Sequence, residues 1–160
     1  MADITQAIQI TLKNEGGYVN NPLDSGGATN FGILQRDWPS VNIAAITAEQ
    51  AASWYQTTTQ PQRFNNPLYS QINSQAILNK LFDMGVLFGV GSAVMMLQQV
   101  LQVTADGGFG PATLAALNAD DSDMTLSAYK SRLHQHEIGV GEAHPTDIVF
   151  EEGWGTRIDS

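Results

Sequence analysis

The stretch from Glu15 to Ile33, which reads EGGYVNNPLDSGGATNFGI, constrains the fold more than any other part of the chain. It follows directly on apolar residues at helical spacing, and it is dense in glycine and other turn-forming residues. Glycine at this density requires the backbone to turn tightly or to approach another group closely. The carboxylates of Glu15 and Asp24 lie on either side of such a turn. We therefore expect them to face one cleft, with the rest of the chain serving as scaffold.

The segment before this stretch is predicted to be a helix. Asp3 and Gln6 have the spacing of a capping box, and apolar residues follow with a helical period. This pattern predicts a helix over about residues 4–14 that ends at Gly16 and Gly17. After the turn, the apolar segment 31–38 is expected to start a second helix before Pro39.

The remaining chain also favours helices. A second capping-box pattern at Thr47 and Gln50 opens a helix to about residue 57. Further helices are expected at about 74–87, 94–101, 111–117 and 123–138, with an irregular tail from Gly139. Because no segment alternates convincingly between apolar and polar residues, the sequence predicts a mainly α, compact single domain over 1–160, with about six to eight helices.

Charge and composition exclude several classes of function. The chain of 160 residues carries a net charge of −9 and contains no cysteine, so we expect no binding of nucleic acid through phosphates and no thiolate metal site. Residues two apart on a helix point to different faces, which argues against a metal site at His134, His136 and Glu137. The acidic run 120–123 is interpreted as a solvated helix-capping loop rather than a calcium site. We expect no metal and no cofactor.

The two carboxylates suggest acid–base chemistry. The carboxyl end of a helix disfavours a negative charge, so its dipole should favour the protonated form of Glu15, as a general acid requires. An ionised Asp24 and the hydroxyl of Thr29 could hold a water on the opposite wall, which is the arrangement of inverting glycosidases. Two structural alternatives stay open: Glu-Gly-Gly can simply end a helix, and Asp-Ser-Gly-Gly can simply form a turn.

At these residues the sequence resembles glycoside hydrolase family 108, a family of bacterial and phage N-acetylmuramidases. The shared pattern is E-G-G-Y-x-N-x-P-x-D-x-G-G-x-T-x-x-G-I, which begins at Glu15 and ends at Ile33. The similarity extends over nearly the whole chain. It includes Thr47 to Ala51, Leu81-Phe82-Asp83 with residues up to Leu101, Asp106 to Leu114, and Phe150-x-x-Gly153-Trp154-x-x-Arg157.

The resemblance implies a lysozyme-like fold and cleavage of the β-1,4 bond between N-acetylmuramic acid and N-acetylglucosamine. By the same resemblance Glu15 is the catalytic acid, with Asp24 and Thr29 as partners on the water side. It divides the domain into a catalytic portion, 1–90, and a helical portion, 91–160, that resembles a peptidoglycan-binding segment. We expect contacts with substrate from Tyr18, Asn20, Asn30 and Asp83, although Asp83 on its apolar helix also fits a buried hydrogen-bonding residue that holds the cleft.

The resemblance also predicts the partner and the place of action. The partner is the peptidoglycan glycan strand, and we expect a monomer that does not insert into membranes. The N-terminus lacks the pattern of a secretory signal. We therefore expect synthesis in the host cytoplasm and action on the wall in the periplasm, either as a phage endolysin released with a holin or through a secretion system. A non-catalytic wall-binding module and a lytic transglycosylase are the alternatives.

Three positions depart from the family pattern. Leu87 and Phe88 stand where relatives tend to have Asn-Ser, and Met96 stands where they often have Trp. All three are apolar, so contacts to substrate or the architecture of the cleft could differ there. The motif 106–114 fits either glycan binding or a packed helix-turn unit, and Trp54 and Trp154 fit core packing better than sugar stacking.

Overall fold

The structure is a computed structural model that describes residues 1–20, 28–36, 38–57, 64–143 and 148–160. Only the backbone is described for residues 140–143 and 148–152. The described part is mainly helical, with seven α-helices and one two-stranded sheet. This confirms the fold class and helix number expected from the sequence.

Helix α1, Ile4–Glu15, begins at Asp3, whose side chain accepts a hydrogen bond from the Thr5 backbone N–H at 2.8 Å. The expected reciprocal bond from Gln6 is replaced, because the Asp3 N–H donates to the Gln75 side chain at the start of α3. The helix buries Ala7 and Ile8. It ends after Glu15, where Gly16 adopts φ +70°, a conformation that favours glycine.

A small lobe follows α1 in the chain. Strands β1, Thr29–Asn30, and β2, Ile33–Leu34, pair antiparallel with Asn30 opposite Ile33. The helix expected from residue 31 is therefore wrong. Phe31 and Gly32 both have positive φ, +51° and +73°, which is the requirement of a type I′ hairpin turn.

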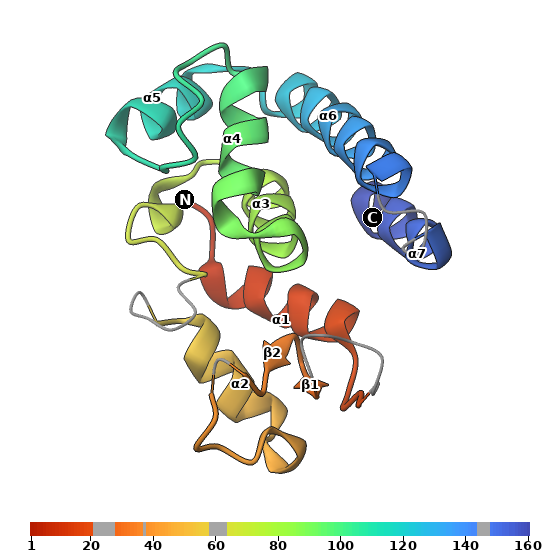
Figure 1. The fold of residues 1–160 in the computed structure, drawn as a ribbon. Coiled ribbons are helices and arrows are strands. Elements are labelled where there is room, and N and C mark those ends of the chain that lie inside the picture. The colour runs from red at the N-terminus through yellow and green to blue at the C-terminus, as the bar shows by residue number, and fades with distance from the viewer. Residues whose placement is uncertain (21–27, 37, 58–63, 144–147) are drawn as a thin grey trace.

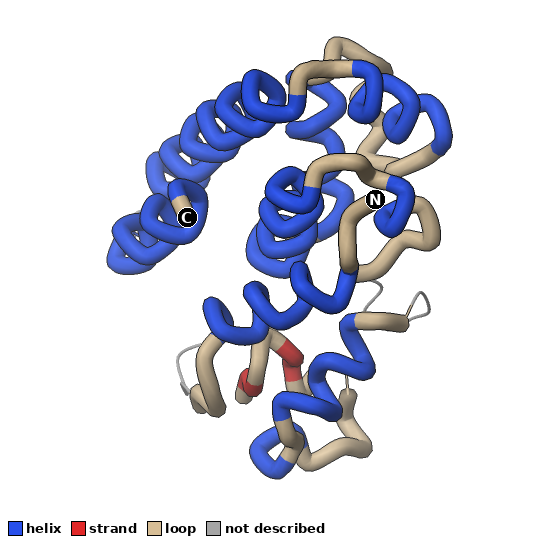
Figure 2. Tube along the Cα trace, turned by 180° about the vertical axis from the view of Figure 1, so that it is seen from behind, coloured by secondary structure: helices blue, strands red, loops and turns tan. Residues whose placement is uncertain are grey.

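Helix α2, Ala48–Tyr55, completes this lobe, and the predicted capping box between Thr47 and Gln50 is confirmed in both directions. A 3-10 helix, Ile43–Ala45, lies between the hairpin and α2. The core of the lobe consists of Ile33, Ile43, Ile46 and Ala51. Figures 1 and 2 show α1 running between this lobe and the larger helical part of the molecule.

The larger part begins with a second 3-10 helix, Tyr69–Gln71, and contains α3, Gln75–Phe88, α4, Val90–Val100, and α5, Pro111–Ala119. Ser74 caps α3, and Pro111 occupies the first turn of α5, so both helices start close to the predicted positions 74 and 111. The break after α3 is confined to Gly89, with φ +89°, so α4 begins earlier than expected. The core of this part includes Leu81, Phe82 and Leu97.

Two long helices end the chain: α6, Ser122–Ala143, and α7, Ile148–Asp159. The Asp121 carboxylate accepts from the backbone N–H groups of Asp123 and Met124, so the acidic run does cap α6. The expected irregular tail is wrong, since α7 is helical despite Gly153 and Gly155. Ile158 is completely buried in the main core, and such packing outweighs the weak helix propensity of glycine.

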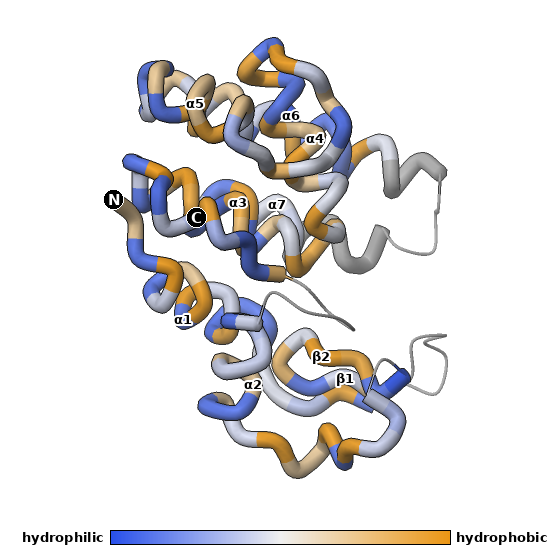
Figure 3. Tube along the Cα trace, turned by 90° about the vertical axis from the view of Figure 1, so that its left-hand side faces the viewer, coloured by the Kyte–Doolittle hydropathy of each residue, from blue (hydrophilic) through white to orange (hydrophobic). Residues whose placement is uncertain are grey.

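Hydrophilic and hydrophobic residues are interspersed along these helices (Figure 3). Among the described residues, no helix combines the length and apolar character needed to span a membrane.

Candidate active site

Glu15 lies at the last position of α1, where the helix gives way to the turn that the sequence singled out. Its side chain is 16% exposed, so the carboxylate is largely enclosed by protein. The elements around it are α2 with the hairpin on one side and α3 with α7 on the other (Figure 1). The residue predicted to be the acid thus lies where the two parts of the molecule meet.

On the side of the small lobe, the Glu15 carboxylate packs against the hairpin turn at Gly32. A Cβ atom at Gly32 would lie 2.7 Å from Glu15 Oε2 and 2.5 Å from the Tyr55 hydroxyl. The Tyr55 hydroxyl donates to the Phe31 carbonyl at 2.7 Å, which fixes the same turn. Burial, and then the charge of Glu15, raise the pKa of Tyr55 far above its usual range, so this hydroxyl stays a neutral donor.

On the opposite side, Arg157 of α7 reaches both Glu15 and Asp83. Arg157 Nη2 lies 2.6 Å from Glu15 Oε1 and 2.7 Å from Asp83 Oδ1. Arg157 Nε donates to Asp83 Oδ2 at 2.7 Å, so the guanidinium holds Asp83 with two parallel bonds. Its side chain is 11% exposed. The same guanidinium thus contacts two carboxylates, one at the end of α1 and one on α3.

Asp83 is buried at 2% and belongs to α3. Besides Arg157, its Oδ2 accepts from Asn14 Nδ2 at 3.2 Å. The structure thus places Asp83 beneath the site with protein partners on both carboxylate oxygens, which matches the expected buried residue that holds the cleft.

Thr29 and the residues after Glu15 are joined through backbone pairing. Val19 and Thr29 exchange two hydrogen bonds, each 2.8 Å long, in an antiparallel bridge. This bridge ties together the two ends of the segment that carries Asp24. Asp24 itself lies outside the described residues, which leave out 21–27.

Of the other residues expected to contact substrate, some are exposed and one is buried. Tyr18 is 47% exposed and Asn20 is exposed, so both side chains are open to a ligand. Asn30 is buried at 4%, and its amide donates to the Ile43 carbonyl at 2.7 Å. The structure thus places Asn30 as a link between the hairpin and the rest of the small lobe.

The aromatic residues mostly pack against one another. Trp38 and Trp54 stack with ring centroids 4.7 Å apart and planes 10° apart, at the edge of the small-lobe core. Trp154 meets the edge of Phe88, which also contacts the ring of His136. Of the residues that depart from the family pattern, Phe88 thus joins α3 to α6 and α7, and Met96 is buried at 3%.

The motif at 106–114 is organised by Gln98. The buried Gln98 amide donates to Asp106 Oδ1, to the Gly108 carbonyl and to the Thr113 hydroxyl, and its oxygen accepts from the Gly107 N–H. Gly107 has φ +75°, and a Cβ there would lie 2.9 Å from the Gly91 carbonyl oxygen. These contacts support the interpretation of the motif as a packed helix-turn unit.

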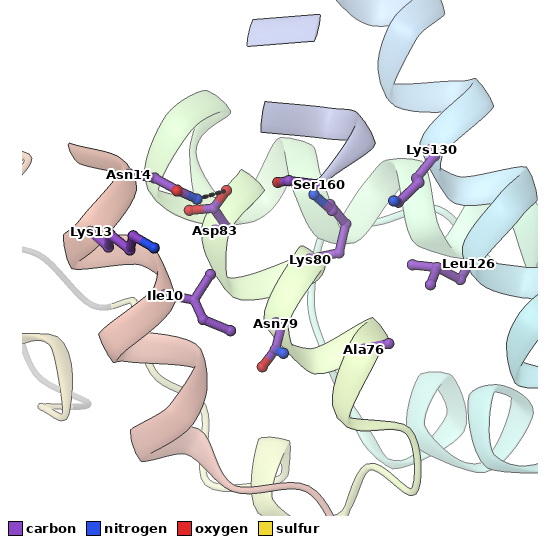
Figure 4. A pocket seen from close by; sticks show the side chains of 10 residues that line it. All are labelled: Ile10, Lys13, Asn14, Ala76, Asn79, Lys80, Asp83, Leu126, Lys130 and Ser160. Atoms are coloured by element: carbon purple, nitrogen blue, oxygen red, sulfur yellow. Dashed lines mark hydrogen bonds between the residues drawn. The ribbon is translucent and has the colours of Figure 1, made fainter. Parts of the chain in front are cut away.

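A pocket of about 330 Å³ lies behind Asp83, between α1, α3 and α6 (Figure 4). All three lysines of the chain, Lys13, Lys80 and Lys130, line it. Lys80 Nζ donates to the Arg157 carbonyl at 2.6 Å, and Lys130 Nζ donates to the Asp159 carbonyl. Burial lowers the pKa of Lys80 to about 8. Lys80 and Lys130 thus donate hydrogen bonds to carbonyls at the end of α7 and hold that helix beside the site.

Sequence reasoning identified Glu15 but gave no role to Arg157, Tyr55 or Gly32 in the geometry of the site. Arg157 and Gly32 belong to the family patterns quoted above, but the residues around Arg157 carry no local signal of its ion-pair partner. That partner is set by the packing of α7 on α3, which only the structure reveals.

The fold and this enclosed carboxylate describe a small helical hydrolase of the lysozyme type. The profile of the family described as Glycosyl hydrolase 108 matches residues 8–89, and that described as Predicted Peptidoglycan domain matches residues 92–159. The chain belongs to glycosyl hydrolase family 108, and it is a glycoside hydrolase, a muramidase that acts on peptidoglycan of the cell wall.

Among solved structures, the protein is similar to the one described as the structure of Brucella abortus SagA. The two share 28% sequence identity with a TM-score of 0.79, over 96% of this chain and 88% of that one. A search of curated proteins finds no match.

Proposed function

We propose that the enzyme hydrolyses the β-1,4 bond between N-acetylmuramic acid and N-acetylglucosamine, with Glu15 as the general acid. The observation that carries this proposal is the position of Glu15, which ends α1 and is enclosed between Gly32 and Arg157. An enclosed carboxylic acid can donate a proton to the leaving glycosidic oxygen.

Asp24 and Thr29 act on the water side in this proposal. Thr29 belongs to β1, and the backbone bridge to Val19 keeps it close in the fold to the turn that follows Glu15. Asp24 as base and the Thr29 hydroxyl would together orient the attacking water. Tyr18 and Asn20, which are exposed, contact the sugar chain, while Asn30 and Asp83 support the site from within.

The test is a digest of purified sacculi analysed by mass spectrometry, with wild type, Glu15→Gln and the matched control Glu49→Gln. Glu49 is an exposed residue in the first turn of α2, away from the site. We expect reducing muramic ends from the wild type and Glu49→Gln, and none from Glu15→Gln, with all three folded by circular dichroism. Retained digestion by Glu15→Gln would remove Glu15 from the role of acid.

The products also decide between the alternative activities. Muramic ends in the 1,6-anhydro form would identify a lytic transglycosylase, which needs one acid and no positioned water. Binding to sacculi without any released fragment would identify a wall-binding module.

For the biological role, we propose a phage endolysin, with a secretion-system effector as the alternative. The support is the wall substrate. Expression in a Gram-negative host should cause lysis only when a membrane-permeabilising holin is co-expressed. Lysis that instead depends on a secretion apparatus would contradict the endolysin role.

A further inference from the structure

The last helix brings a positive charge to the predicted acid. Arg157 Nη2 contacts Glu15 Oε1 at 2.6 Å, and the same Nη2, together with Nε, donates to the Asp83 carboxylate. Arg157 belongs to the segment matched as a peptidoglycan domain, whereas Glu15 and Asp83 belong to the segment matched as the glycosyl hydrolase. The contact therefore crosses the boundary between the two matched segments.

We propose that Arg157 positions Glu15 in the active site and that Asp83 neutralises the charge of Arg157. The C-terminal segment thereby completes the catalytic centre. This inference rests on the proposed role of Glu15 as acid. Arg157 holds Oε1, which leaves Oε2, the oxygen beside Gly32, to carry the proton that is transferred to the glycosidic oxygen.

The two bonds to Asp83 explain how an arginine can stand beside an acid that must be protonated. An isolated guanidinium at this distance would strongly favour the Glu15 carboxylate over the carboxylic acid. Because Asp83 is buried and bonded to the same guanidinium, the Arg157–Asp83 pair has no net charge. The pair then acts on Oε1 through the close Nη2–Oε1 contact and with little net charge.

The placement of Arg157 is itself supported from several sides. Its carbonyl accepts from Lys80 Nζ, and Asn14 donates to the Asp83 carboxylate. Arg157 is thus held by Asp83 at its side chain and by Lys80 at its backbone, which is the kind of support that keeps a group in its productive geometry.

Within the part of the chain that the structure describes, the charged and titratable groups that face Glu15 come from three elements. They are Arg157 on α7, Asp83 on α3 and the Tyr55 hydroxyl on α2, with Lys80 behind the Arg157–Asp83 pair. Because Tyr55 stays neutral, changes at Arg157 and Asp83 should dominate the dependence of activity on pH. The alkaline limb of that dependence reports loss of the proton from the acid.

The experiment measures kcat and KM against pH on soluble glycan fragments for Asp83→Asn, Arg157→Gln and Arg157→Lys, with thermal unfolding for each variant. Asp83→Asn removes the negative charge that neutralises the guanidinium. We therefore expect the alkaline limb of the pH–rate profile of this variant to move down by about one pH unit. Arg157→Gln leaves Asp83 unbalanced, so its limb should move up. Arg157→Lys keeps the charge but loses the fork, so kcat should fall about tenfold or more with KM nearly unchanged and the limb in place.

The matched control is Arg132→Gln, because Arg132 on α6 contacts Gln99 and lies outside the site. It should match the wild type in rate and pH profile. If Arg157→Gln does not fold, Asp83→Asn and Arg157→Lys still decide. Alkaline limbs that coincide with the wild type in Asp83→Asn, or a wild-type kcat in Arg157→Lys, would overturn the proposal.

These outcomes are separate from those that test the reaction itself. An inactive Glu15→Gln together with a fully active Arg157→Lys would leave the proposed function standing and remove Arg157 from it. A wild-type digest without reducing muramic ends would instead remove the proposed function.

Discussion

At the scale of the residue, the site requires glycine at position 32, because no side chain fits there. Gly32 has φ +73°, and a Cβ atom would not fit there, because the Tyr55 hydroxyl and the Glu15 carboxylate occupy its place. Its neighbours are two polar groups whose positions matter for the proposed chemistry. The hairpin turn is thereby part of the site and not only a connection between β1 and β2.

We predict that Gly32→Ala destabilises the fold by about 2–5 kcal/mol, because a left-handed backbone and an overpacked contact both oppose the methyl group. It should also reduce activity, since the methyl must displace Glu15 or Tyr55. Thermal unfolding and the sacculus digest measure the two effects. The control Gly139→Ala adds a methyl with nothing within 4 Å on an exposed part of α6, and should stabilise slightly, by about 0.5–1 kcal/mol.

Individual residues of the site could be predicted to different degrees. Glu15 was found because its signal is local: a helix end, a glycine pair and a family pattern within one stretch. The ion pair between Glu15 and Arg157 has no local signal, since the partners are joined only by the packing of α7 against α3. The hydroxyl of Tyr55 was missed for the same reason.

At the scale of the element, α6 and α7 are joined through His134. Its ring nitrogens lie 3.1 Å from the Glu137 carboxylate and 2.9 Å from that of Asp159. The hydrogen bond to Asp159 is the largest cause that raises the pKa of His134 above its ordinary value of 6.5, and the bond to His134 lowers the pKa of Asp159 below 3.8. Asp159 is two residues from Arg157, so this link bears on the end of α7 that serves the site.

The sign of the pH dependence follows from these directions. A raised histidine pKa stabilises the fold below about pH 6.5, and this contribution is lost as the pH rises through the folded value. The lowered pKa of Asp159 contributes stability above about pH 3.8 that is lost on further acidification. The link is therefore strongest between these limits.

We predict that the stability difference between wild type and His134→Gln is larger near about pH 5.5 than near about pH 8.5, as measured by denaturant unfolding. His136→Gln is the contrast on the same helix, because burial lowers the pKa of His136 and its protonation opposes folding. The stability of that variant relative to the wild type should therefore increase as the pH falls. Parallel trends for the two variants would contradict this account.

Elements were predictable where their ends are set by neighbouring residues. The capping-box patterns at Asp3 and Thr47 marked real helix starts. The hairpin was missed because its turn places Phe31, a bulky residue, at positive φ, which sequence patterns do not suggest. Helix α7 was missed because its two glycines lower the local helix propensity, and the helix depends on tertiary packing.

At the scale of the whole molecule, the charge distribution separates this enzyme from basic muramidases. The chain carries −9, and all three of its lysines line one pocket, where two of them donate to the end of α7. An acidic protein gains no electrostatic attraction toward an anionic wall. Its binding to substrate must then depend on short-range contacts in the cleft.

We therefore predict that salt inhibits this enzyme less than it inhibits a basic muramidase. Screening at about 0.15 M ionic strength removes long-range attraction, which this protein does not use. Lysis of the same sacculi by both enzymes across a salt series measures the effect. A steep loss of activity between low and physiological salt would count against it.

The contact between Glu15 and Arg157 also has a consequence for the order of folding. It joins residues that are far apart in sequence, and such contacts form late, because a large loop must close before they form. If Arg157 completes the site as proposed, a ribosome-bound chain stays inactive until α7 has emerged and docked. Cleavage by a protease within α7 would likewise yield a fragment that retains Glu15 and its glycine turn but lacks the group that holds the acid in place. The competence to cut the wall would then be acquired only once α7 has been synthesised and has docked on α3.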